Sequence, residues 1–184
     1  MTFAETERLV LRRAREEDLE PLLLSWADPD MTRYTGVRDD VPGFLARMIA
    51  EMQEKQPGDT GANGPWYQYI LERRSDGAVV GDLGAGFGVP GERQVELGYR
   101  ILPAFQRQGY AVEALAGLID HLITEHEIHR FVGVAAAPNA PSIAVLRSLG
   151  FRQEGFFRRS FLCGGEWLDD AYFALLAEEW RGKT

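Results

Sequence analysis

The chain has 184 residues, 45% of them hydrophobic and 26% charged, which is typical of a single globular domain. Its formal net charge of −8 argues against a general nucleic-acid binder, because affinity for phosphate backbones needs clustered Lys and Arg. The charge would suit a cationic substrate, although solubility alone also explains it. A single cysteine, Cys163, excludes an internal disulfide, and no run of about 18 apolar residues predicts a membrane span. We therefore expect one cytoplasmic domain over residues 1–184.

The first half of the chain predicts one strand, two helices and a three-stranded antiparallel meander. Alternation predicts the first strand, and apolar residues at helical spacing predict both helices. A loop rich in Gly and Pro separates the helices from the meander. In chain order these elements are residues 7–13 (strand), 16–26 and 41–55 (helices), 56–65 (loop), and 66–72, 78–87 and 94–102 (strands).

The second half predicts a long amphipathic helix at residues 110–127, a short buried strand at 130–135 and a second helix at 139–149. Two strands, at residues 151–161 and 167–176, then form a hairpin around a glycine-rich turn. The complete order predicts an α+β fold with a mixed central sheet of about seven strands, flanked by about four helices.

The turn that joins the strand at residues 94–102 to the long helix has the composition of an anion site. The first turn of a helix leaves backbone N–H groups without internal partners, and together with the helix dipole these groups attract phosphate. Gly109 has no Cβ, so a phosphate can approach the backbone closely. Arg107 in the same turn can add a charge-assisted hydrogen bond. An ordinary helix start with a convenient glycine remains the alternative.

Motifs in this turn and downstream of it resemble those of the GNAT N-acetyltransferases. The spacing Gln106-x-x-Gly109-x-Ala111 is similar to the family's Q/R-x-x-G-x-G/A signature. Other segments resemble the subgroup that includes the ribosomal-protein-alanine N-acetyltransferases, and the resemblance spans residues 7–176. These segments are R-L-V-L-R at 8–12, E-L-G-Y at 96–99, N-A-P-S at 139–142, L-G-F at 149–151 and E-G at 154–155.

The resemblance implies a GNAT fold, in which the central sheet splays open between two middle strands and acetyl-CoA lies in the V-shaped opening. It implies that the pantetheine arm pairs with backbone near Ile101 and Leu102, and that the pyrophosphate contacts the turn before the long helix. No metal is expected. The residues expected to bind the cofactor are Ile101, Leu102, Gln106, Arg107, Gln108, Gly109, Tyr110, Ala111, Asn139 and Ser142.

Within that set, the resemblance implies that Asn139 points towards the cofactor and that Ser142 lies near the thiol. Helix capping is an alternative explanation for both residues, since both types favour helix N-termini. The two roles are compatible, so both stay open.

The chemistry needs a base, because an amine is mostly protonated at pH 7 and must lose a proton before it attacks a thioester. Glu96 is the candidate base, since it is a charged residue in an apolar strand, on the face that Gly98 and Arg100 share. A solvent-facing glutamate is the alternative. Ser142 is the candidate hydroxyl beside the leaving thiol. The tyrosine that acts as general acid in many GNAT enzymes has no counterpart after Ser142, which leaves the acid step open.

The expected function is transfer of the acetyl group of acetyl-CoA to a primary amine by direct attack in a ternary complex. The acceptor would be a protein N-terminal α-amine or a small-molecule amine, with no nucleic acid or membrane as partner. A homodimer is an open possibility. A non-catalytic CoA-binding sensor or pseudoenzyme of the same fold is one alternative, and an unrelated α+β binding module is another.

Several residues have weaker claims to a site. In the family that the sequence resembles, Trp26, Tyr34 and residues 56–65 belong to the region that usually forms the acceptor wall. Three aromatic residues suit either a substrate pocket or the core, and three histidines lack metal-ligand spacing, so that surface roles are expected. These residues are Trp66, Tyr67 and Tyr69, and His121, His126 and His129. Cys163 has no patterned histidine beside it that would favour an acyl-cysteine route.

Overall fold

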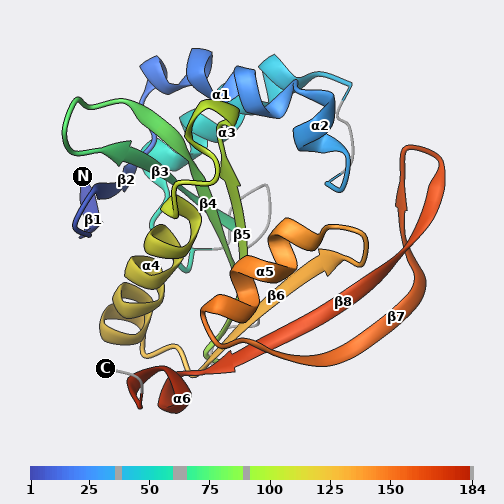
Figure 1. Ribbon diagram of the computed structural model, residues 1–184. Coiled ribbons are helices and arrows are strands. Elements are labelled where there is room, and N and C mark those ends of the chain that lie inside the picture. Colours follow the sequence, from blue (N-terminus) through green and yellow to red (C-terminus); the bar gives the residue numbers. More distant parts are fainter. Residues whose placement is uncertain (36–38, 60–65, 89–91, 183–184) are drawn as a thin grey trace.

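Eight strands form one sheet in the computed structural model, which describes residues 1–35, 39–59, 66–88 and 92–182. Their order across the sheet is β1-β2-β3-β4-β5-β6-β8-β7 (Figure 1). The strands are β1 (Thr2–Glu5), β2 (Leu9–Arg13), β3 (Trp66–Arg73), β4 (Val79–Phe87), β5 (Gln94–Ile101), β6 (Arg130–Ala136), β7 (Arg152–Cys163) and β8 (Glu166–Leu176). The helices are α1 (Leu19–Trp26), α2 (Pro29–Thr32), α3 (Val41–Glu54), α4 (Tyr110–His126), α5 (Ala140–Ser148) and α6 (Ala177–Arg181).

The α+β class and the order of the expected elements are confirmed, but the molecule contains three short elements that the sequence did not predict. β1 has four residues and is held by main-chain pairing with β2 across an irregular register. α2 and α6 have four and five residues, which is too short for a helical period to emerge. The helix expected at residues 16–26 begins with a 3₁₀ turn, η1 (Glu16–Asp18). From residue 60 onward, the loop expected at residues 56–65 lies outside the described residues.

Helices cover both faces of the sheet, with α1 and α3 on one face and α4 on the other (Figure 1). β3 shows the division, because successive side chains of a strand point to opposite faces. Trp66 and Gln68 line a cavity together with residues of α1 and α3. Tyr67 and Tyr69 are fully buried on the opposite side, where Phe3 packs against both rings and against α4. Alternation along β3 therefore places its cavity residues on one face of the sheet and its core tyrosines on the other.

The sheet opens between β5 and β6. These two strands are parallel neighbours over only three residue pairs, which join residues 94–96 to residues 130–132. β5 stays paired with β4 as far as Ile101, and β6 stays paired with β8 along its whole length. In the described sheet, residues 97–101 of β5 therefore have no strand on the β6 side. The V-shaped splay expected from the sequence is confirmed.

The described residues also bear on two other possibilities, a membrane-spanning helix and a metal site. Among the helices of the described residues, none combines the length and the apolar character that a bilayer crossing requires. Within the same residues, no group of three His, Cys, Asp or Glu side chains is arranged to hold a metal ion.

Candidate functional site

The turn between β5 and α4 presents backbone to solvent. A short 3₁₀ turn, η2 (Pro103–Phe105), follows β5, and the next four residues, 106–109, are exposed. Gly109 is the N-cap of α4 with φ 83°, a left-handed conformation that glycine adopts without strain. It has no side chain to cap the helix, so the N–H groups of the first turn of α4 face outwards at the positive end of the helix dipole. The corner expected to hold a diphosphate is open.

Two glutamines of the turn hold its shape. The Gln106 side chain donates from Nε2 to the carbonyl oxygen of Ile101 at 3.0 Å, and Gln108 Nε2 donates to the carbonyl oxygen of Ala104 at 3.1 Å. Both side chains therefore bond to the chain itself in this structure. Arg107 is exposed and has φ 60°, so its side chain is available to an anion at the turn.

Arg8 of the N-terminal segment supports the turn from behind, a contact that the sequence did not predict. Its Nη1 donates to the carbonyl oxygen of Gln108 at 3.0 Å, and its Nε lies 2.6 Å from Oε2 of Glu113 in α4. The guanidinium stands 4.5 Å from the centre of the Tyr110 ring. Tyr110 is buried beneath this arginine.

Across the splay, a tyrosine of β5 reaches the start of α5. The Tyr99 hydroxyl lies 2.7 Å from Oγ of Ser142 and donates to the Ser142 carbonyl oxygen at 2.9 Å. Burial raises the pKa of Tyr99 to about 12. The Asn139 side chain accepts from the Ser142 backbone N–H at 3.3 Å and caps α5, which confirms the capping interpretation for Asn139. The sequence offered no tyrosine after Ser142, but the fold brings one to it from 43 residues earlier in the chain.

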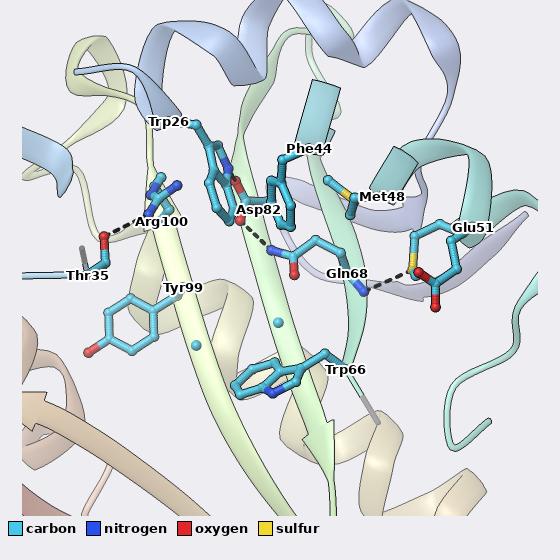
Figure 2. A pocket seen from close by; sticks show the side chains of 13 residues that line it. Trp26, Thr35, Phe44, Met48, Glu51, Trp66, Gln68, Asp82, Tyr99 and Arg100 are labelled. Carbon is cyan, nitrogen blue, oxygen red and sulfur yellow. Dashed lines mark hydrogen bonds between the residues drawn. The ribbon is translucent and has the colours of Figure 1, made fainter. Parts of the chain in front are cut away.

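A cavity of about 330 Å³ lies on the α1 and α3 face of the sheet (Figure 2). Aromatic and thioether side chains form its walls, and polar side chains from three neighbouring strands form its floor. Its lining residues are Trp26, Thr35, Phe44, Met48, Glu51, Met52, Trp66, Gln68, Asp82, Gly84, Gly98, Tyr99 and Arg100.

A buried carboxylate, Asp82, organises the floor of this cavity. It accepts a hydrogen bond from Trp26 Nε1 at 3.1 Å and another from the Gln68 amide (Figure 2). Arg100 is its register partner on β5, donates to Thr35 Oγ1 at 3.2 Å and lies 3.9 Å from the centre of the Trp26 ring. Burial raises the pKa of Asp82, and the charge of Arg100 opposes that shift. Asp82 was not singled out from the sequence. Its position as the one acid in the glycine-rich strand V-V-G-D-L-G-A-G-F could have marked it as a candidate.

Trp66 separates the cavity from a smaller hollow. Its indole lies on β4 and β5 where glycines leave room, since a Cβ at Gly84 or Gly86 would come within 3.0 Å of the ring. The hollow beyond it, of about 180 Å³, is lined by Trp66, Glu96 and four other residues. Glu96 is open to solvent there, yet partial burial of its carboxyl raises the pKa. A carboxyl with a raised pKa beside a cavity suits a proton acceptor.

The remaining candidates divide between cavity, core and surface. Trp26 and Trp66 line the cavity, whereas Tyr34 is not among the described lining residues. Tyr67 and Tyr69 are core residues.

The surface roles expected for the histidines are wrong for two of the three. His121 and His126 are half-buried with their rings 5.7 Å apart, and burial lowers the pKa of both. His129 is exposed. Cys163 is buried and its thiol contacts the carbonyl oxygen of Arg33 at 3.3 Å.

The arrangement has three chemical parts. The exposed start of α4 has no side-chain cap, and two hydroxyls, from Tyr99 and Ser142, meet across the opening of the sheet. A cavity with a carboxylate beside it lies on the other face. Group transfer between two bound molecules needs sites for both of them beside the reacting groups, and these three parts lie close to one strand, β5.

Comparisons with known proteins point to the same chemistry. The family described as "Acetyltransferase (GNAT) domain" matches residues 8–152. The uncharacterized N-acetyltransferase YnaD of Bacillus subtilis is 30% identical over 96% of this chain and 98% of its own length. The [ribosomal protein uS5]-alanine N-acetyltransferase of Escherichia coli is 33% identical over 95% of this chain and 91% of its own. The structure of Mycobacterium smegmatis RimJ in complex with CoA-disulfide is 27% identical, with a TM-score of 0.77 over 93% of this chain and 83% of that one.

Proposed function

Because this chain belongs to the GNAT family of acetyltransferases, we propose that it acetylates the α-amine of a protein N-terminus with acetyl-CoA. The observation that carries the proposal is the parting of β5 and β6 between an open anion site and a cavity. The uS5-alanine enzyme, which is 33% identical over nearly the whole chain, supports an N-terminal acceptor.

The anion site fits the diphosphate of CoA. The first-turn N–H groups of α4 would hold the phosphate oxygens, and the exposed Arg107 would add charge. From there the pantetheine arm would run along the free edge of β5 near Ile101 and Leu102. The Ile101 carbonyl accepts from Gln106 in the structure, so the remaining free groups of that edge would carry the pairing. Asn139 and Ser142 would then lie at the thioester end, beside Tyr99.

The cavity fits a small amine or the first residues of a peptide. Its volume of about 330 Å³ lies at the lower end of the range of about 300–1,000 Å³ for small-molecule pockets. Trp26, Phe44 and Trp66 would enclose the acceptor's apolar part. Phe44 and Trp66 can present aromatic faces to a cationic head group, whereas Arg100 already occupies the face of Trp26.

Glu96 would take the proton from the ammonium group, directly or through water. An α-amine has a pKa roughly 2.5 units below that of a lysine side chain. A carboxylate base therefore removes a proton more easily from an N-terminus than from a lysine side chain. After attack, a main-chain N–H of β5 would stabilise the oxyanion. Ser142 would donate a hydrogen bond to the sulfur as the thiolate departs.

A thiol-release assay tests the proposal. Acetyl-CoA is offered with peptides that begin with Ala or Ser, with the same peptides already acetylated at the N-terminus, and with spermidine and free lysine. The proposal expects CoA release with the free N-termini and none with the blocked peptides. Faster turnover of spermidine or lysine would move the acceptor to small amines. CoA binding without turnover on any amine would support the non-catalytic alternative.

A further inference from the structure

Two hydroxyl groups meet where the sheet opens, and more than one arrangement of their protons is compatible with the hydrogen bonds between them. The Tyr99 hydroxyl is within hydrogen-bond distance of both oxygens of Ser142, at 2.7 Å from Oγ and 2.9 Å from the carbonyl oxygen. A phenol has one proton to donate, whereas a backbone carbonyl can only accept. Two arrangements are therefore available to the pair.

In the first arrangement Tyr99 donates to the Ser142 carbonyl, and the Ser142 hydroxyl donates to the phenol oxygen. The serine proton then points at the tyrosine. In the second arrangement Tyr99 donates to Ser142 Oγ, which frees the serine proton for a third group. A negative charge near Ser142 favours the second arrangement, because it attracts that proton. Hydrogen bonds in such a chain strengthen one another.

We propose that Tyr99 is a positioning residue that aims and polarises the Ser142 hydroxyl towards the sulfur of the departing CoA. The inference rests on the proposed function, and it adds a residue and a role to the step that the sequence left open. No proton leaves the pair: Tyr99 keeps its O–H bond, and Ser142 donates a hydrogen bond to the thiolate while the carbon–sulfur bond breaks.

The surroundings of Tyr99 support this role. It lies on β5 beyond the last residue pair with β6, so its side chain bridges an opening in the sheet to reach Ser142. Burial raises the pKa of its hydroxyl to about 12. The phenol therefore stays protonated, and able to donate a hydrogen bond, at neutral and mildly alkaline pH. The Asn139 cap fixes the backbone of Ser142 from the other side.

The test is a double-mutant cycle of Tyr99→Phe and Ser142→Ala, measured as CoA release from acetyl-CoA with the best acceptor of the thiol-release assay. Tyr99→Phe should lower kcat about tenfold, with KM for acetyl-CoA and the acid limb of the pH profile unchanged. In the Ser142→Ala background the same change should have little further effect, because the hydroxyl that Tyr99 orients is gone. Ser142→Thr, which keeps a hydroxyl, should retain sensitivity to Tyr99→Phe.

Tyr172→Phe is the matched control, since Tyr172 of β8 is half-exposed and packs against Phe157 away from the opening; its kcat should equal that of the wild type. Independent, multiplicative losses from Tyr99→Phe and Ser142→Ala would overturn the positioning role. So would a fall in Tm without a fall in kcat, which would leave Tyr99 as a tie between β5 and α5. In both cases the wild type still acetylates its acceptor, so the proposed function stands. Absence of wild-type turnover with every acceptor would overturn both.

Discussion

The two regions beside β5 that we propose as binding sites are built from different parts of the chain. On the α4 side, the anion site is made of consecutive residues, 106–111, and offers main-chain N–H groups. On the α1 and α3 side, the cavity is made of side chains from two helices and three strands that are up to 74 residues apart in the chain, from Trp26 to Arg100. A main-chain site depends on backbone shape, while a side-chain site depends on residue identity. Substitutions should therefore have a large effect on the first region only when they block the backbone.

Gly109→Asp should produce the largest effect. It places a side chain and a negative charge at the N-cap of α4 in a left-handed conformation, where a phosphate would bind. Loss of two or three hydrogen bonds to a charged group, each worth about 1.5–3 kcal/mol, predicts a fall in CoA affinity of more than about 10²-fold. Titration calorimetry with CoA measures it.

Gly77→Asp supplies the control for backbone strain. Gly77 has φ 73°, nothing lies within 4 Å of the position that a Cβ would take there, and the residue belongs to the hairpin turn between β3 and β4. CoA affinity should be unchanged in this variant. Retained affinity in Gly109→Asp would show that the phosphates bind elsewhere.

Glu96→Gln comes next and tests the acceptor face without touching the anion site. General-base catalysis contributes about 10²–10⁴-fold, so kcat should fall at least about 10²-fold while CoA affinity holds. Partial burial raises the pKa of Glu96, so the wild-type rate should rise with pH through a limb above the ordinary value of about 4.3, as the carboxyl loses its proton. The variant should lack this limb. Glu125→Gln, on the exposed surface of α4, is the control; wild-type kcat in Glu96→Gln would remove it as the base.

Trp66→Ala should have an intermediate effect. The indole separates the cavity from the hollow that contains Glu96, so its removal merges the two spaces. We expect kcat/KM to fall about tenfold for an acceptor with a small N-terminal residue, in keeping with the loss of roughly 1.4 kcal/mol of aromatic packing. For acceptors with a bulky N-terminal residue, kcat/KM should fall less. Trp167→Ala, the control, removes a tryptophan that is 58% exposed on β8. It should leave kcat/KM unchanged for both kinds of acceptor. Equal losses for short and bulky acceptors would contradict a dividing role.

Arg107→Ala should give the smallest effect. Its side chain is exposed, and exposed ion pairs contribute about 0–1 kcal/mol, so CoA affinity should fall by about fivefold or less, and less at high salt. Arg159, another exposed arginine with a positive φ of 51°, provides the matched control. A loss as large as that of Gly109→Asp would mean that a side chain, rather than main chain, dominates the anion site.

The anion turn could be proposed from the sequence because its pattern lies within six consecutive residues, and the structure has an exposed turn and an uncapped helix start there. The alternation in β5 likewise placed Glu96 on the face of Gly98 and Arg100, and Gly98 and Arg100 do line the cavity. Local patterns also gave all of the longer helices and strands. The short helices α2 and α6 were missed because four or five residues make little more than one helical turn, and β1 was missed because its sequence T-F-A-E does not alternate.

Contacts between distant segments could not be predicted in the same way. Arg8 reaches Gln108 and Glu113 from about 100 residues away, and Tyr99 meets Ser142 only because the sheet opens between their elements. Asp82 was overlooked because a lone acid in a strand has two explanations until its neighbours Trp26 and Gln68 are known. In each case the missing information was tertiary proximity.

The short seam between β5 and β6 has a consequence for how stability is distributed. In the described sheet, three residue pairs between β5 and β6 join the strands β1–β5 to the strands β6–β8, so few ladder hydrogen bonds oppose a local separation of the two blocks. Amide hydrogen exchange without global unfolding is most accessible at such a boundary. A molecule seated there would clamp one block to the other, and occupancy would slow that exchange in proportion to its affinity. A ligand bound in the opening between β5 and β6 would thus stabilise the contact between the two blocks.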